Sequence, residues 1–148
     1  LDRGRLSLSA GCLGGAKRSL QISIEHSKQR VQFGKPIGEQ QAIQWMLADM
    51  AAEIYAMESM VYRSAWAHDQ GQRITREAAI VKMYCSEALG RIVDSGVQIH
   101  GGMGFIRECE IERAYRDSRI NRIFEGTNDR RGLLDVALRE RELPLSLC

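Results

Sequence analysis

The stretch IQWMLADMAAEIYAMESMV, residues 43–61, decides the fold of this chain. Its large apolar residues recur at steps of four and three, and they are Ile43, Leu47, Met50, Ile54, Met57 and Val61. An α-helix has about 3.6 residues per turn, so this spacing puts all of them on one face. The stretch therefore predicts a long helix that buries that face.

Similar patterns predict helices on both sides of this stretch. An earlier helix, which should continue to the turn at residues 34–36, is marked by Leu6, Leu13, Leu20 and Ile24. A later helix should begin at Thr75 as N-cap and end at the glycines of residues 101–104. Its buried face is predicted to hold Ala79, Met83, Ser86, Leu89, Val93 and Val97. A short helix around residues 111–115 and a last one over about residues 128–139 complete the set.

The fold predicted from these elements is an all-α, up-and-down helical bundle with short connections. No alternating strand pattern and no hairpin dipeptide stands out. A length of 148 residues suits one domain, residues 1–148. Trp45 and Trp66 are either part of the core or part of a partner surface, and we expect core packing for both.

Composition excludes several classes of protein. The chain is 44% hydrophobic and 27% charged with a net charge of +2, which suits a globular protein without a bulk preference for nucleic acid. No apolar run is long enough to span a bilayer. The cysteines are scattered without a C-x-x-C pair, which favours a reducing compartment over a disulfide framework or zinc site. No histidine has a glutamate three residues before it, so a di-metal bundle site is not expected and no metal is predicted.

A second informative stretch is Arg122-Ile123-Phe124-Glu125-Gly126-Thr127-Asn128-Asp129. Glycine lets the backbone approach a ligand closely, and Thr127 or Asn128 can cap a following helix. A carboxylate at such a bend is a candidate general base. The alternative on this octet alone is an ordinary surface glutamate beside a capped turn.

Two further segments have both an ordinary and a functional interpretation. Gly101-Gly102-Met103-Gly104 either ends a helix or lets a flat cofactor lie on bare backbone, with Gln98 one turn earlier. Arg30-Val31-Gln32-Phe33-Gly34 is either a helix end with an apolar anchor or a place for a diphosphate and an adenine, because Arg suits phosphate and Phe suits stacking. Asp2, Arg3 and Arg5 are solvated charges on the ordinary interpretation.

In their order along the chain, these segments resemble the C-terminal helical domain of acyl-CoA dehydrogenases. The matching segments are Leu1-Asp2-Arg3-Gly4-Arg5, Arg30-Val31-Gln32-Phe33-Gly34-Lys35-Pro36-Ile37, Gln41 with Leu47-Ala48-Asp49-Met50, Gln98-Ile99-His100-Gly101-Gly102-Met103-Gly104-Phe105, Arg116-Asp117 and Ile123-Phe124-Glu125-Gly126-Thr127-Asn128. The resemblance covers nearly the whole chain. It is specific because the order and the spacing match together.

The resemblance implies an FAD-dependent oxidoreductase that converts a fatty acyl-CoA thioester to a trans-2-enoyl-CoA. Glu125 would remove the α-proton while a hydride leaves the β-carbon for the flavin. In some relatives the base lies on the first helix, at the position of Gly4, and glycine cannot serve there. The implied FAD contacts are Arg30, Gln32, Phe33, Gln41, Gln98, Gly101, Gly102, Thr127 and Asn128. The implied substrate contacts are Asp2, Arg5 and Gly126.

The resemblance also implies partners and a setting. Family members build the FAD site across subunits, so a homotetramer or dimer is expected, with electron-transfer flavoprotein as electron acceptor. The compartment would be a mitochondrial matrix or a bacterial cytoplasm. The family's N-terminal helical domain and middle β-domain are absent from these 148 residues, so this domain is expected to be inactive alone.

One segment departs from the family pattern. The family usually continues the Glu-Gly-Thr motif with apolar residues and then an arginine, whereas this chain reads Asp129-Arg130-Arg131-Gly132. This departure and the absent domains favour a second hypothesis, a non-catalytic helical interaction module. A third is an acyl-CoA oxidase, which uses the same glutamate but passes electrons to oxygen.

Overall fold

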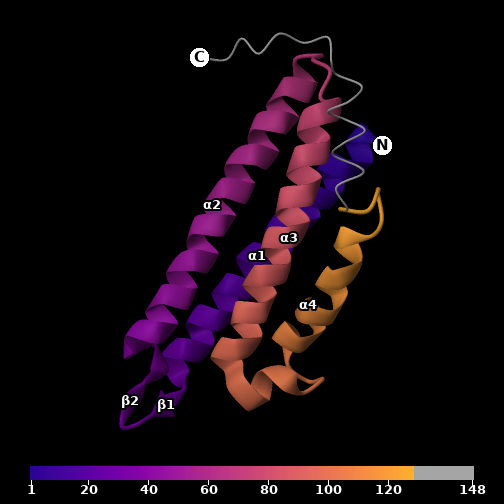
Figure 1. The fold of residues 1–148 in the computed structure, drawn as a ribbon. Coiled ribbons are helices and arrows are strands. Elements are labelled where there is room, and N and C mark those ends of the chain that lie inside the picture. Colours follow the sequence, from indigo (N-terminus) through magenta and orange to yellow (C-terminus); the bar gives the residue numbers. More distant parts are fainter. Residues whose placement is uncertain (129–148) are drawn as a thin grey trace.

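The computed structural model of the protein describes residues 1–128. Helices α1 (Asp2–Gln29), α2 (Gln41–Asp69) and α3 (Thr75–His100) run up and down along one another, and α4 (Glu110–Ser118) lies beside α3 (Figure 1). Short 3-10 turns join or end these helices, and they are η1 (Ile37–Glu39), η2 (Gly101–Phe105) and η3 (Arg119–Arg122). The predicted all-α, up-and-down bundle is confirmed.

The core lies where α1, α2 and α3 meet. The face predicted for α2 is confirmed, because Met50, Ile54, Met57 and Val61 are buried, while Ile43 and Leu47 pack against the core from its edge. Helix α1 buries the predicted Leu13 but otherwise mainly small residues, among them Ser9, Ser19 and Ser23. Each of these hydroxyls donates to a carbonyl one turn earlier in α1, so a polar group is buried without a loss of hydrogen bonding.

The buried face of α3 is centred one residue earlier than predicted. Ser86, Leu89 and Val93 are buried as expected, but Ala79, Met83 and Val97 are only half-buried. The positions that replace them are Ala78, Val81, Lys82, Cys85, Ala88, Ile92, Gly96 and Ile99. This rotation brings a lysine into the interior of the bundle.

The connection between α1 and α2 contains a small hairpin that the sequence pattern did not predict. Strands β1 (Val31–Gln32) and β2 (Lys35–Pro36) pair antiparallel, and α1 already ends at Gln29. The turn residues Phe33 and Gly34 have φ of 54° and 80°. Positive φ at both central residues matches the twist of a tight hairpin, although phenylalanine is an unusual residue there.

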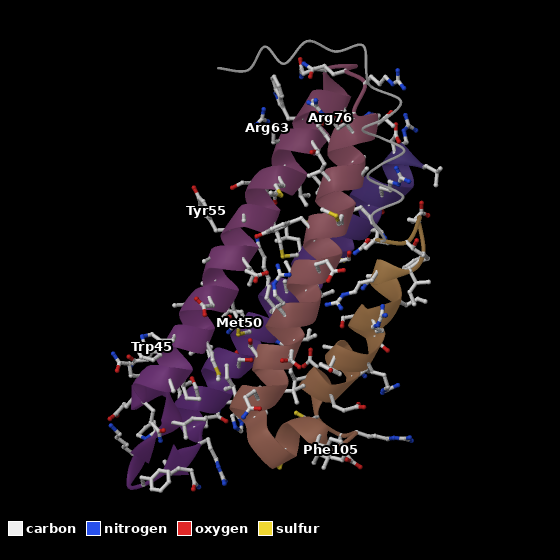
Figure 2. All side chains as sticks on the ribbon, viewed as in Figure 1. Trp45, Met50, Tyr55, Arg63, Arg76 and Phe105 are labelled. Carbon is white, nitrogen blue, oxygen red and sulfur yellow. The ribbon has the colours of Figure 1, made fainter. Side chains whose placement is uncertain are left out.

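Two other local predictions were wrong. The N-cap of α3 is Ile74, and Thr75 is the first helical residue. The Thr75 hydroxyl donates to Asp2 Oδ2 at 2.7 Å and so ties the start of α3 to the start of α1. Trp45 and Trp66 are 62% and 61% exposed, because both lie on the outer side of α2 rather than in the core. Figure 2 shows Trp45 pointing away from the bundle while Met50 points inward.

The helix predicted over about residues 128–139 lies outside the described residues, except for Asn128. Within residues 1–128, no helix is long and apolar enough to cross a bilayer. The same part of the chain contains no cluster of three or more His, Cys, Asp or Glu side chains suited to a metal ion.

Candidate functional site

The segment that contains Glu125 returns to the end of the bundle where α1 begins (Figure 1). Helix α4 and turn η3 run back along α3, and residues 123–128 then cross toward Arg5 on α1 and Lys82 on α3. Glu125 is half-buried there. Two helices and a loop that are distant in sequence therefore meet around this carboxylate.

Glu125 and Gly126 both have left-handed backbone conformations, with φ of 59° and 95°. For a residue with a side chain this conformation costs about 1–3 kcal/mol, and it persists only where the surroundings impose it. Two cationic side chains do so here. Arg5 Nε donates to the carbonyl oxygen of Glu125 at 3.1 Å, and Lys82 Nζ donates to that of Gly126 at 2.6 Å.

The Glu125 carboxylate lies directly against the backbone of Gly4. A Cβ atom built on Gly4 would be 2.7 Å from Glu125 Oε2 and 2.9 Å from its Cδ, closer than real Cβ atoms approach such groups. A glycine at position 4 is therefore what allows the carboxylate to occupy this place. The two positions at which the resemblance places a catalytic base are thus neighbours in this structure.

Lys82 lies beneath this loop and is only 3% exposed. Besides the Gly126 carbonyl, its ammonium group donates to Asn128 Oδ1 at 2.7 Å. Burial lowers the pKa of Lys82, and the charge of Arg5 lowers it further, while the acidic groups Cys12, Glu87 and Glu125 oppose the change.

The Asn128 side chain extends the same network into α3. Its Nδ2 donates to Ser86 Oγ at 2.6 Å and to Glu87 Oε1 at 3.0 Å. Glu87 also pairs with Arg122, at 3.2 Å between Oε2 and Nε. The loop is consequently held at residues 122, 125, 126 and 128. The half-buried Asn128 amide is engaged within the chain, whereas Thr127 beside it is exposed.

The glycine turn and the hairpin meet at the opposite end of the bundle. They line a hollow of about 620 Å³ together with the ends of α1 and α3. Among its lining residues are five of the predicted cofactor contacts, which are Arg30, Gln32, Phe33, Gly101 and Gly102. Gly101 has φ 59° and ψ −138°, a conformation that only glycine adopts readily. Gln98 and Gln41 are exposed at the same end, on the last turn of α3 and at the first residue of α2.

Two histidines form one wall of this hollow. The rings of His26 and His100 stack with centroids 4.2 Å apart, and His100 Nδ1 lies 2.7 Å from the Gly96 carbonyl oxygen. Burial lowers the pKa of His26, with smaller contributions from His100 and Arg30. The hollow is therefore lined by the Arg30 side chain, by aromatic rings and by the bare backbone of Gly101 and Gly102.

The predicted site residues thus form two groups at the two ends of α1. Its 28 residues span about 42 Å at 1.5 Å per residue. Asp2, Arg5 and residues 125–128 lie at one end, and the hairpin with the glycine turn lies at the other. A further hollow of about 1,310 Å³ between α3 and α4 is lined by neither Glu125 nor the predicted cofactor residues.

A family model for the C-terminal domain of acyl-CoA dehydrogenases matches residues 1–137. The chain belongs to the acyl-CoA dehydrogenase family. It is 43% identical over 129 residues to the probable acyl-CoA dehydrogenase YngJ of Bacillus subtilis, a match that covers 87% of this chain and 34% of that protein. It is 44% identical over 128 residues to the caffeyl-CoA reductase-Etf complex subunit CarC of Acetobacterium woodii, covering 86% of this chain and 34% of that protein.

The same family includes solved structures with this bundle. An acyl-CoA dehydrogenase from Bacillus anthracis, complexed with FAD, superimposes with a TM-score of 0.87 at 43% identity, over 94% of this chain and 28% of that one. The chain spans about a quarter to a third of the length of the curated relatives that it matches. The fold and the family are therefore established for a helical domain that is one part of those larger proteins.

Sequence reasoning missed the residues that hold the Glu125 loop. Lys82, Ser86, Glu87 and Arg122 were not among the predicted site residues, although each contacts the loop or its partners. The one available signal was Lys82 itself, an unusual charge on a helix face that is otherwise apolar or small. Placing the buried face one residue too late hid that signal.

Proposed function

We propose that this chain supplies the catalytic base of an FAD-dependent acyl-CoA dehydrogenation, and that the base is Glu125. The observation that carries the proposal is the strained, multiply held position of Glu125, with its carboxylate against Gly4. Strained backbone that persists under such constraint is concentrated at functional sites.

The chemistry of each side chain at the Glu125 end of the bundle indicates its role. The Glu125 carboxylate accepts the α-proton of an acyl-CoA thioester, for which a partly desolvated position near bound substrate is suitable. Arg5 fixes the Glu125 carbonyl and leaves the rest of its guanidinium near Gly126, within reach of an anionic substrate group. Asp2 positions the start of α3 through Thr75 and, on this proposal, also lies near the CoA moiety.

The opposite end fits FAD. Arg30 provides a planar cation for a diphosphate, the Phe33 ring is 93% exposed and free to stack, and the Gly101-Gly102 backbone leaves room for a flat group. When bound, FAD accepts the hydride from the β-carbon of the substrate. Gln32, Gln41 and Gln98 would supply side-chain amides around it, and Thr127 with Asn128 would face a cofactor at the Glu125 end.

The separation of the two groups supports an assembly of several copies. Residues 5–29 of α1, which span about 38 Å at 1.5 Å per residue, lie between Glu125 and Phe33, and this is longer than an extended FAD molecule. One cofactor cannot contact both groups of a single chain, so each group would serve a different cofactor in a homotetramer or dimer. The CarC relative is named as part of a complex with Etf, which supports electron-transfer flavoprotein as the redox partner.

A second candidate function is the reverse reaction, and the name of the same relative favours it. CarC is named a subunit of a caffeyl-CoA reductase-Etf complex, which is compatible with reduction of an enoyl-CoA. Glu125 would then deliver the α-proton instead of removing it. The residues required on this chain are the same for both directions.

The test is an anaerobic visible spectrum of the FAD-loaded protein that carries this chain, mixed with short, medium and long saturated acyl-CoAs. We expect bleaching of the oxidised flavin band, with Glu125→Gln abolishing it and Glu108→Gln, an exposed control, leaving it unchanged. Oxidation of the dithionite-reduced flavin by enoyl-CoAs reads the reverse direction. Normal bleaching by Glu125→Gln would refute the assignment of the base, and bound flavin that no acyl-CoA bleaches would favour a non-catalytic module.

A further inference from the structure

The burial of Lys82 at its place in the bundle costs free energy. Only 3% of the Lys82 residue is exposed, so its ammonium group has lost most of its hydration. Buried lysines are normally compensated by a carboxylate. The two atoms that accept its hydrogen bonds are both uncharged, the Gly126 carbonyl oxygen and Asn128 Oδ1. Core packing alone would be served equally well by a methionine or leucine.

The two residues that Lys82 contacts, Gly126 and Asn128, lie one and three positions after Glu125. The Gly126 carbonyl belongs to the peptide that follows Gly126, and the Glu125 carbonyl held by Arg5 belongs to the peptide before it. With the two successive peptide planes fixed by α1 and α3, the dihedral angles of Gly126 are set. The left-handed turn at Glu125 is then held in a single orientation relative to Gly4 on α1.

Asn128 extends this restraint. Its Oδ1 accepts from Lys82, while its Nδ2 donates to Ser86 and Glu87 on the next turn of α3. Lys82 therefore holds the loop on both sides of Thr127. A loop restrained at two points resists the rotation that would swing the Glu125 carboxylate away from α1.

We propose that Lys82 is the positioning residue of the catalytic base, which holds Glu125 in its left-handed conformation through the Gly126 carbonyl and the Asn128 amide. The catalytic part of this inference rests on the proposed function of Glu125, whereas the restraint of the loop does not. Lys82 also places a cation near the carboxylate, among Arg5 and Cys12 from α1 and Glu87 from α3.

The test compares Lys82→Met with Lys17→Met in the FAD-loaded protein. Methionine keeps the apolar stem of Lys82 and removes the donor and the charge. Lys17 is an exposed lysine paired with Glu58 on the surface, so its variant controls for the loss of a positive charge. Asn128→Ala is a second variant that removes one accepting atom and leaves Lys82 in place.

The first readout is hydrogen–deuterium exchange over residues 122–128. We expect faster exchange there in Lys82→Met and Asn128→Ala, with the exchange of α2 unchanged and no effect of Lys17→Met. Unchanged exchange of the loop in Lys82→Met would overturn the proposal directly. This readout needs no activity, so it tests the restraint even if the protein proves not to be a dehydrogenase.

The second readout is the rate of flavin reduction per bound FAD at saturating acyl-CoA. Misplacement of a catalytic group by about 1 Å lowers a rate by roughly 100-fold, so we expect a loss of that order in Lys82→Met with little change in KM. A rate per FAD within threefold of the unaltered protein would show that Lys82 is only structural.

A wild-type protein that binds FAD but reduces it with no acyl-CoA would refute the proposed function rather than the restraint. An acyl-CoA with sulfur in place of its β-carbon separates the steps further, because it can lose an α-proton but cannot deliver a hydride. Loss of an α-deuterium label from this compound should be slower in Lys82→Met. Equal rates of label loss in the variant and the unaltered protein would overturn the positioning role.

Discussion

Gly4→Ala tests the contact between α1 and the Glu125 carboxylate. The added Cβ would lie 2.7 Å from Oε2, and ordinary contact begins at 3.4 Å, so the carboxylate must move by 3.4 − 2.7 = 0.7 Å or more. A displacement of about 1 Å at a catalytic group lowers rates by roughly 100-fold, which gives about tenfold or more here. Stability should hold or rise slightly, because the displaced group is the flexible end of a side chain and alanine suits a helix better than glycine by about 1 kcal/mol.

Gly11→Ala is the matched control for this variant. Gly11 lies two turns further along α1, and a Cβ atom built there meets nothing within 4 Å. It should show the same gain in thermal stability with no change in the rate of flavin reduction. The assay is anaerobic stopped-flow reduction per bound FAD, together with a thermal melt of each variant. An unchanged rate in Gly4→Ala would refute the position of the carboxylate, because the clash would then not exist.

Two further predictions concern the other end of the bundle. Phe33→Ala should weaken FAD binding by about tenfold, since base–aromatic stacking contributes about 1–3 kcal/mol, while Phe105→Ala, a change at another largely exposed phenylalanine, should leave the affinity in a fluorescence titration unchanged. The folded-state pKa of His26 is lowered, so the unfolded chain binds more protons below about pH 6.5 and stability is lost as the pH falls through that value. Urea unfolding of the unaltered protein and of His26→Gln between pH 8 and pH 5.5 should show a weaker acid destabilisation in the variant, and parallel curves would contradict this assignment.

How much of the fold the sequence could predict depended on what each helix buries. Helix α2 buries large apolar residues such as Met50 and Ile54, so its periodicity identified the correct face. Helix α1 buries Ser9, Ser19 and Ser23, whose hydroxyls bond to their own helix, and a search for large apolar residues cannot detect such a face. The leucine pattern of α1 gave the helix and one core residue, Leu13, whereas Leu6, Leu20 and Ile24 are only half-buried.

Local signals also failed where the structure depends on distant partners. The hairpin strands are two residues long, too short for an alternating pattern, and its turn contains Phe33 where glycine or asparagine is usual. The hydrogen bond of Lys82 joins residues 44 positions apart, so nothing near residue 82 in the sequence indicates its partner. The resemblance indicated which residues to examine at both ends of α1, but not which helices hold them.

The octet around Glu125 left the choice between a base and a surface glutamate open for a physical reason. The left-handed backbone at Glu125 costs about 1–3 kcal/mol, and the octet's own backbone hydrogen bond, from Asn128 to the Arg122 carbonyl oxygen, does not involve Glu125. Hydrogen bonds from charged donors contribute about 1.5–3 kcal/mol each, and Arg5 and Lys82 supply one to each of two successive carbonyls. Together these bonds outweigh the strain, so the conformation of Glu125 is set by α1 and α3. The evidence for a functional carboxylate therefore lies in the helices that hold it, outside the motif that contains it.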